Sequence, residues 1–322
     1  MNEAYKMIFK LSTLIFIIST RHKYFIITEK LSMKKYIFLL LLLTLYLNAS
    51  SQLLSDSILI EGHYRTFHFT KPINSISNRS LVFVLHGSGG TGLQIITGAK
   101  KLAAIEEKEN LLLVYPDGYL HFWNECRKAS TAIANKENIN EEVFFDEMIR
   151  YFKKHYDINT HQVFAIGTSG GGHMAYKLAL TMPTKIKAIT AIIANLPDAK
   201  NMDCLASGIA IPVMIINGTN DPVNPYNGGE VVIPGTILGT VLSTEQTFHY
   251  WAGLAGYEGE PTKELLPDTD PTDGKTIEKY RYFKKGKPEI VLLKVIGGRH
   301  DYPNDIDVYL EAWDFLKRQI TY

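Results

Sequence analysis

The chain has 322 residues, of which 46% are hydrophobic and 21% are charged. This composition is typical of a globular protein with a large core, and it excludes disordered and fibrous classes. Lysine and arginine (34) nearly balance aspartate and glutamate (33). No long run of one sign occurs, so the sequence shows no electrostatic surface for nucleic acid. We therefore expect a small or neutral substrate as the partner.

The N-terminal segment predicts export to the periplasm or the cell exterior. Two lysines at 34–35 are followed by an apolar run over 36–47 and by small residues at 49–51. A membrane-spanning helix needs about 20 apolar residues, and this run is shorter. We interpret 33–51 as a cleaved signal peptide, with no stable membrane anchor; an uncleaved anchor is the alternative. Residues 1–32 are interpreted as the result of a start codon assigned too far upstream, or as a disordered segment, and 52–322 as the catalytic domain.

Cys126 and Cys204 are the two cysteines of the chain. Export permits a disulfide between them. Two separate buried thiols are equally compatible with the sequence, because spacing does not show how close the two Cα atoms lie. The chain contains no H-E-x-x-H motif and no close cluster of cysteine and histidine, so we expect neither a metal nor another cofactor.

Apolar runs rich in β-formers alternate with amphipathic segments along the chain, which predicts an α/β fold with a mostly parallel central sheet flanked by helices. The stretch 221–289 is less regular, and we expect it to form an excursion above the sheet and part of a substrate cleft. The predicted strands are 81–85, 111–115, 163–166, 188–194, 213–217 and 290–296, and the predicted helices are 93–108, 141–155, 171–181, 243–252 and 305–320.

Ser169 is the predicted nucleophile, within the segment Gly-Thr-Ser-Gly-Gly at 167–171. The segment fits G-x-S-x-G, with a predicted strand before it and a predicted helix after it, as a nucleophile elbow requires. Such a turn strains the serine backbone, so its neighbours must be small. A serine hydroxyl is a weak nucleophile near neutral pH. A histidine must therefore take its proton, and a carboxylate must orient that histidine.

Asp221 and His300 are the predicted partners of Ser169. The expected order is serine, acid, histidine, each on a loop at the carboxyl end of a strand. Asp221 directly follows one predicted strand, and His300 lies between the last predicted strand and the final helix. Asp198 and Asp203, which follow the preceding strand, are the alternative acids.

Two other histidines are assigned different roles. His173 lies on the helix behind the serine, where we expect it to pack. His86 begins the glycine-rich loop 86–90, which we expect it to shape. Acyl transfer also needs two N–H donors for the negative charge that develops on the carbonyl oxygen. We expect the backbone N–H groups of Ser88 and Gly170 to form this oxyanion hole.

Taken together, these segments resemble the secreted polyhydroxybutyrate depolymerase and feruloyl or acetylxylan esterase branch of the α/β-hydrolases. The resemblance covers about residues 60–320, and the order of its motifs carries it. It implies Ser169 as nucleophile, Asp221 as acid and His300 as base. The segments concerned are 86–90, 115–118, 123–124, 167–171, 217–221, 225–229 and 297–300.

The chain departs from the pattern of this branch at three places. Tyr302 stands where the branch often has tryptophan, glutamates at 141–142 replace an aspartate pair, and a cysteine usual near Tyr257 is missing. These departures leave the three expected catalytic residues in place. They affect the pocket shape and the disulfide pattern, so the resemblance does not fix a substrate.

Four side chains are candidates for contact with the substrate. Trp123 and Arg127 lie on a loop after a strand, and aromatic rings suit flat phenolic or sugar faces. Tyr226 and Tyr302 flank the predicted acid and base. Structural roles are the alternative for all four residues.

We therefore expect a secreted serine esterase that forms an acyl-enzyme. The resemblance implies a small-molecule or polysaccharide-linked ester as substrate, with feruloyl, acetyl and polyhydroxyalkanoate esters all open. One alternative is a peptidase like prolyl oligopeptidase, but the short segment before residue 81 cannot hold its usual β-propeller. Another is a non-catalytic binding protein, which the intact serine, aspartate and histidine set disfavours.

Overall fold

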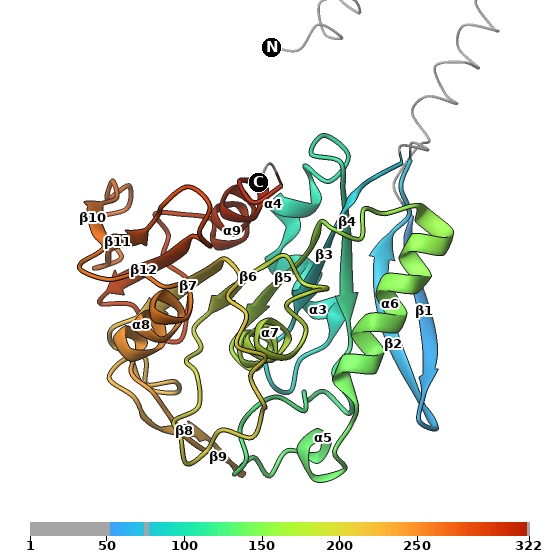
Figure 1. Ribbon diagram of the computed structural model, residues 1–322, viewed down its shortest axis with the longest axis horizontal. Helices are drawn as coiled ribbons and strands as arrows, with labels where there is room; N and C mark the ends of the chain where they lie inside the picture. Colours follow the sequence, from blue (N-terminus) through green and yellow to red (C-terminus); the bar gives the residue numbers. More distant parts are fainter. Residues whose placement is uncertain (1–51, 74–76, 321–322) are drawn as a thin grey trace, which may run out of the picture. The chain divides into compact units, whose positions relative to one another are not determined.

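The structure, a computed structural model, describes residues 52–73 and 77–320 (Figure 1). The predictions for 1–32 and 33–51 lie outside the described residues. Within the described part of the chain, no helix combines the length and the apolar character needed to cross a membrane.

A ten-stranded sheet forms the centre of the fold, in the order β1-β2-β4-β3-β5-β6-β7-β12-β11-β10. The six strands from β4 to β12 in this order are parallel to one another, and antiparallel strands extend the sheet at both edges. The strands of this sheet are β1 (Leu53–Ile60), β2 (His63–Thr70), β3 (Ser80–Leu85), β4 (Leu111–Pro116), β5 (Val163–Thr168), β6 (Ala188–Ile192), β7 (Val213–Gly218), β10 (Thr262–Leu265), β11 (Thr276–Tyr282) and β12 (Ile290–Ile296).

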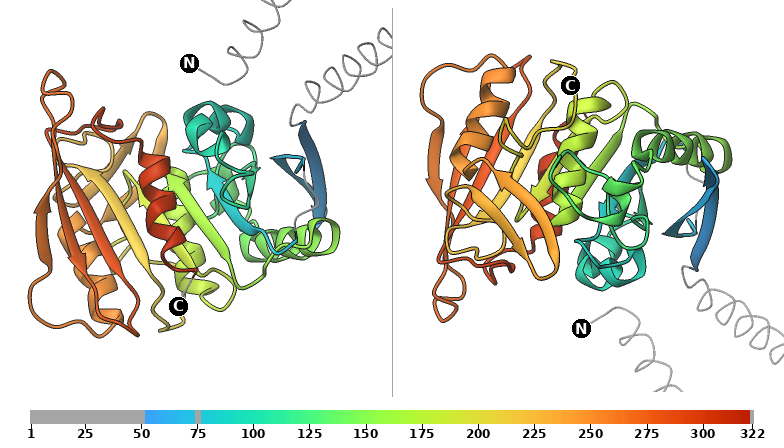
Figure 2. Two further views of the ribbon diagram at one scale, coloured as in Figure 1. Left: turned by 90° about the horizontal axis from the view of Figure 1, so that it is seen from above. Right: turned by 90° about the horizontal axis from the view of Figure 1, so that it is seen from below.

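Helices cover both faces of the sheet (Figure 2). Phe145, Met174 and Trp251, from α6, α7 and α8, join one hydrophobic core. Leu102 and Trp313, from α4 and α9, join the core on the other face. The helices are α3 (Gly92–Gly98), α4 (Lys100–Ala103), α5 (Ile133–Lys136), α6 (Glu141–Tyr156), α7 (Gly170–Thr181), α8 (Thr244–Leu254) and α9 (Val308–Lys317).

The side chains of β3 show why the central strands are continuous apolar runs. Leu81, Phe83 and Leu85 belong to one core, whereas Val82 and Val84 belong to the other. Successive side chains of a strand point to opposite faces, so a strand covered on both faces must be apolar throughout. The fold class predicted from the sequence is confirmed.

Two predicted helices are shorter in the structure. Instead of one helix over 93–108, α3 ends at Gly98, α4 covers four residues, and turns follow. The β-branched residues and glycine at the end of α3 have low helix propensity, which explains the break. The final helix begins after Asp307, whose carboxylate accepts hydrogen bonds from the backbone N–H groups of Tyr309 and Leu310.

The segment after Asp221 is more regular than predicted. Its first part is a separate hairpin of β8 (Gly229–Ile233) and β9 (Thr236–Val241). The prediction of an excursion above the sheet is wrong for the last part, because β10 and β11 join the main sheet beside β12. Their sequence did not show this, since the pairing depends on β12, a distant partner.

Cys126 and Cys204 form a disulfide, with their Cα atoms 5.0 Å apart. The alternative of two separate thiols is therefore wrong. Backbone hydrogen bonds join the same two segments, because Asp203 N–H donates to Cys126 O at 2.9 Å and Lys128 N–H donates to Asn201 O at 2.7 Å. The loop that carries Trp123 and the loop after β6 are thus held together.

Replacing both cysteines by serine should lower the free energy of unfolding by about 2–4 kcal/mol, because the crosslink restricts the unfolded chain. The two residues are 78 positions apart. Urea unfolding followed by circular dichroism measures the difference. Wild-type protein with dithiothreitol should unfold like the double variant. Equal midpoints for the oxidised wild type and the variant would contradict this expectation.

Candidate active site

Ser169 lies in a tight turn between β5 and α7. Its backbone has φ 53° and ψ −116°, in a region that residues with a Cβ rarely adopt. Two hydrogen bonds hold the turn: Ser169 N–H donates to Ile192 O at 2.8 Å, and His173 N–H donates to Ser169 O at 3.0 Å. The strained residue is therefore fixed by β6 on one side and by α7 on the other.

Glycines make this turn possible by allowing close backbone contacts. A Cβ on Gly171 would collide with Leu85 O and would lie 2.7 Å from His86 O. A Cβ on Gly167 would collide with the backbone of Gly171. The first turn of α7 consequently packs directly on the end of β3, which brings the glycine-rich loop after β3 beside Ser169.

Hydrogen bonds join Ser169, His300 and Asp221. His300 Nε2 lies 3.0 Å from Ser169 Oγ, and His300 Nδ1 lies 2.7 Å from Asp221 Oδ2. The backbone N–H groups of Val223 and Asn224 donate to Asp221 Oδ1 at 2.8 and 2.9 Å. The carboxylate is almost entirely buried, whereas 21% of the His300 side chain is exposed. The buried Asp221 carboxylate thus orients the imidazole, and part of the imidazole is accessible to solvent.

The loops that carry Asp221 and His300 are bonded to each other. Asn220 N–H donates to Gly298 O at 2.8 Å, and Gly297 N–H donates to Thr219 Oγ1 at 2.9 Å. Gly218 allows this approach, because a Cβ there would collide with Gly298 O. The separation of the acid and the base is therefore fixed by backbone contacts as well as by their own hydrogen bond.

The alternative acids lie elsewhere. Asp198 accepts a 2.5 Å hydrogen bond from Thr240 Oγ1 and two more from backbone N–H groups, so it ties its loop to β9. Asp203 is exposed. Neither carboxylate contacts His300, whose acidic partner among the described residues is Asp221.

Both ring nitrogens of His86 are engaged with the backbone. His86 Nδ1 lies 2.7 Å from Gly87 O, and Gly118 N–H donates to His86 Nε2 at 2.9 Å. Burial lowers the pKa of His86, so the ring is neutral. His173 is buried on α7, and burial holds its pKa well below the usual value. These positions agree with a loop-shaping residue and a packing residue.

Ser88 and Gly170 lie against each other beside Ser169. A Cβ built on Gly170 would lie 2.8 Å from Ser88 N. Gly170 is the first residue of α7, where a backbone N–H has no acceptor within its own helix. The positive end of the helix dipole is also located there. Two backbone donors are thus available next to the hydroxyl.

A small hollow opens beside these donors. It is too narrow in this structure to hold a free water molecule. The residues that line this small hollow are Ser88, Phe122, Trp123, Glu125, Arg127, Ala132, Gly170 and Leu238.

Trp123 and Arg127 reach the small hollow, each fixed by a buried partner. Trp123 Nε1 donates to His86 O at 2.9 Å, and its ring centroid lies 4.8 Å from that of His86. Arg127 Nε donates to Glu125 Oε1 at 2.7 Å, and both side chains of this pair are only 2% exposed.

Tyr226 and Tyr302 do not line the small hollow. The Tyr226 hydroxyl donates to Glu245 Oε1 at 2.9 Å. The Tyr302 hydroxyl lies 3.0 Å from both Thr168 Oγ1 and the Tyr309 hydroxyl. Tyr302 thus contacts the residue just before Ser169 from the side of α9.

The sequence-based predictions missed four residues of the small hollow, namely Phe122, Glu125, Ala132 and Leu238. Glu125 has a recognisable signal, because it lies two positions before Arg127 and can share its face on an extended segment. Leu238 comes from β9 and is 1% exposed. No sequence signal links Leu238 to the loop of Trp123, since the two segments meet only after folding.

Comparisons with known proteins identify a matching family and several similar esterases. The model of a family described as phospholipase/carboxylesterase matches residues 74–249. Acetylxylan esterase A of Aspergillus oryzae is 24% identical over 220 residues, covering 62% of this chain and 70% of that protein. The protein named "Probable feruloyl esterase C" of Aspergillus niger is 24% identical over 174 residues, covering 53% of this chain and 59% of its own length.

A solved structure shares the fold. The acetyl xylan esterase from Aspergillus awamori superposes with a TM-score of 0.56 at 18% sequence identity. The superposition covers 81% of this chain and 99% of that one. At this identity the likeness concerns the chain path alone.

Gly171→Ala should destabilise the protein by roughly 1–3 kcal/mol, because its Cβ would press on the backbone of β3. Gly253→Ala is the matched control, since a Cβ there meets nothing within 4 Å. In α8 this change should be neutral or slightly stabilising. Urea unfolding of the two variants measures both effects. Equal stability of the two variants would refute the steric role of Gly171.

Proposed function

This chain belongs to the phospholipase/carboxylesterase family, and we propose that it is a serine esterase that removes small acyl groups from hydroxyl-bearing substrates. The observation that carries the proposal is the hydrogen-bonded chain from Ser169 through His300 to the buried Asp221. This arrangement is what an activated serine nucleophile needs.

In the proposed first half-reaction, Ser169 Oγ attacks the ester carbonyl carbon while His300 Nε2 takes the hydroxyl proton. The carbonyl oxygen becomes an oxyanion, and the N–H groups of Ser88 and Gly170 donate to it. The tetrahedral intermediate then collapses. The ester C–O bond breaks, the alcohol leaves with the proton from His300, and the acyl group stays on Ser169. Asp221 holds the tautomer in which Nδ1 carries a proton.

The second half-reaction uses water in place of the alcohol. His300 Nε2 takes a proton from a water molecule, whose oxygen attacks the acyl carbon. The second tetrahedral intermediate is stabilised by the same two N–H groups. On its collapse the acid leaves, and His300 returns the proton to Ser169 Oγ. The partial exposure of His300 gives water access to this position.

The small hollow supports a short acyl group. It adjoins both proposed oxyanion donors, and in this structure it is too narrow for a free water molecule. An acyl group that enters must displace the side chains that line it, and a larger acyl group must displace them further. Trp123 and Leu238, which are 3% and 1% exposed, limit its size. We therefore propose an acetyl group as the preferred acyl part, in place of the larger feruloyl group.

A carbohydrate is the proposed alcohol part of the substrate. Two relatives named above are acetylxylan esterases, which suggests acetylated polysaccharide as the substrate class to test first. In this proposal residues 52–322 are the catalytic unit, and 33–51 direct its export to the periplasm or the cell exterior. The disulfide supports export, because such crosslinks form in oxidising compartments.

Ser169→Ala and His300→Ala should each lower kcat for p-nitrophenyl acetate by about 10⁴- to 10⁶-fold, because either change removes the activated nucleophile. Asp221→Asn should lower it by about 10⁴-fold, since the imidazole then adopts the wrong tautomer. Asp203→Asn, at the exposed alternative acid, is the control and should leave kcat within about twofold. Turnover by Ser169→Ala at the wild-type rate would eliminate the proposed mechanism.

The acyl preference should change when the small hollow is enlarged. Wild-type kcat/KM is expected to fall steeply from p-nitrophenyl acetate to butyrate and hexanoate. Leu238→Ala should raise kcat/KM for butyrate relative to acetate by about tenfold, since one or two methylenes in a pocket are worth about this much. Ile237→Ala, on the same strand but 59% exposed, is the matched control. A flat chain-length profile in the wild type would disprove the short acyl pocket.

A further inference from the structure

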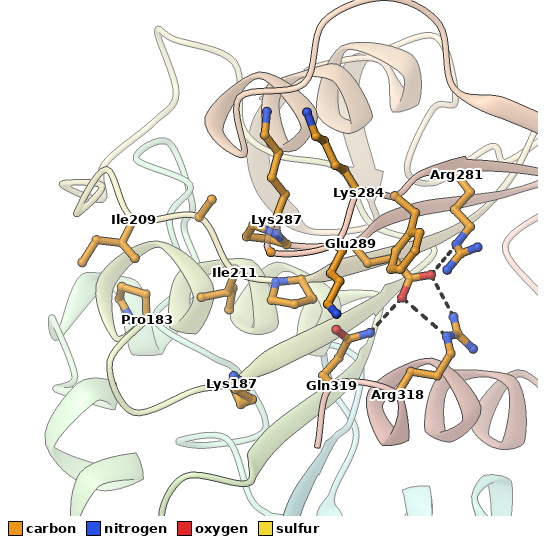
Figure 3. Close-up of a pocket in the computed structure, with 16 residues that line it drawn as sticks. Pro183, Lys187, Ile209, Ile211, Arg281, Lys284, Lys287, Glu289, Arg318 and Gln319 are labelled. Carbon is orange, nitrogen blue, oxygen red and sulfur yellow. Dashed lines mark hydrogen bonds and ion pairs between the residues drawn. The ribbon is translucent and has the colours of Figure 1, made fainter. Parts of the chain in front are cut away.

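A second, larger hollow lies at the amino ends of the parallel strands, opposite the carboxyl ends where Ser169 lies. Its volume is about 420 Å³, within the range of ligand pockets. Lys187 and Glu289 line it (Figure 3), as does Pro212. Each of these three residues directly precedes a strand, namely β6, β12 and β7. The strands β7 and β12 carry Asp221 and His300 beyond their other ends. At about 3.3 Å per residue, these strands separate this hollow from Asp221 and His300 by about 20 Å.

This hollow, called here the basic hollow, has a strong local charge. Six cationic side chains and one acidic side chain line it, for a formal charge of +5 (6 minus 1), whereas the whole chain has +1. Positive charge is therefore concentrated around the basic hollow. The cations are Lys187, Arg281, Lys284, Lys285, Lys287 and Arg318.

The single carboxylate, Glu289, is fully engaged by the two arginines. Arg281 Nε and Arg318 Nη2 donate to Glu289 Oε1 at 2.6 and 3.1 Å, and Gln319 Nε2 donates to Oε2 at 2.9 Å (Figure 3). Burial would raise the pKa of Glu289, but the hydrogen bonds from these groups outweigh it and lower the pKa. Glu289 thus stays ionised and accepts hydrogen bonds from both arginines.

The lysines of the segment after β11 have no such partner. Among the described residues, no acidic side chain forms an ion pair with Lys284, Lys285 or Lys287. Lys287 donates to Gly256 O and lies over the ring of Tyr257. In Figure 3, Lys284 and Lys287 extend side by side from one side of the basic hollow, and Arg318 lies on the other. Close like charges favour an anion between them.

The floor of the basic hollow is apolar. Pro183, Ile211 and Pro212 contribute to it, and Phe283 and Ile209 at its margin are 51% and 49% exposed. Arg281 stacks on the Phe283 ring, with its guanidinium carbon 4.2 Å from the ring centroid. Such a surface packs against the C–H faces of a ring compound, while the lysines above it attract negative charge.

We propose that the basic hollow binds a carboxylated oligosaccharide, a sugar chain with uronic acid units. Sugar rings suit the apolar floor with its two prolines, and carboxylates suit lysine ammonium groups. Phosphate chains are less well matched, because the arginine forks that grip phosphate best are held by Glu289. Single-stranded nucleic acid stacks on successive aromatic side chains, and Phe283 is the one aromatic residue among those that line the hollow.

Such a site would hold the protein on an acidic polymer and leave the edge that carries Ser169 free. The inference rests on the charges and shape of the basic hollow, and it does not depend on the proposed esterase activity. Binding and turnover can therefore be tested separately on one preparation.

The test is calorimetric titration of the protein with an oligogalacturonate. A neutral xylo-oligosaccharide, inorganic phosphate and a single-stranded oligodeoxynucleotide serve as comparison probes. The double variant Lys284→Gln/Lys285→Gln removes two unpaired cations. Lys153→Gln/Lys154→Gln on α6 is the matched control, because it removes two adjacent exposed lysines elsewhere.

Oligogalacturonate should bind the wild type and bind about fivefold more weakly to Lys284→Gln/Lys285→Gln, with weaker binding at high salt. The α6 control and Ser169→Ala should bind like the wild type, and both double variants should hydrolyse p-nitrophenyl acetate at the wild-type rate. The proposal is overturned if oligogalacturonate does not bind, if both double variants bind equally, or if the neutral sugar, phosphate or the oligonucleotide binds as tightly.

Discussion

The parallel pairing of β5, β6, β7 and β12 is the constraint on which the candidate site depends. Strands that run in the same direction release their loops at the same edge of a sheet. Ser169 and His300, 131 positions apart, and His300 and Asp221, 79 positions apart, therefore meet within hydrogen-bonding distance. The strands that carry these residues are stabilised by the buried cores on both faces of the sheet.

Close contacts at glycines then set the distances between the catalytic loops, which the strand order alone does not determine. Gly171 lets α7 pack on the end of β3, which places the loop of Ser88 beside the hydroxyl. The contact of Gly218 with Gly298 joins the acid loop to the base loop. Both are close backbone contacts that any side chain would block. The geometry of the site thus depends on these glycines, which have no side chain, as much as on the catalytic side chains.

Long buried elements could be predicted well from the sequence. The strand 290–296 has the predicted bounds, and the helix predicted over 141–155 ends one residue later. Their apolar periodicity is set by the two cores, so it appears in the sequence itself. The pairing of β10 and β11 with the main sheet, and the entry of Leu238 into the small hollow, could not be predicted. These features depend on distant partners, and exposed edge strands carry little apolar pattern.

Labelling with a fluorophosphonate tests the central claim most directly, because the reagent reacts with a serine whose hydroxyl is activated by a histidine. Peptide mass spectrometry should find one adduct, on the peptide that contains Ser169. The adduct should be absent from Ser169→Ala, and its formation should be strongly slowed in His300→Ala. An adduct on a different residue, or labelling of His300→Ala at the wild-type rate, would contradict the account.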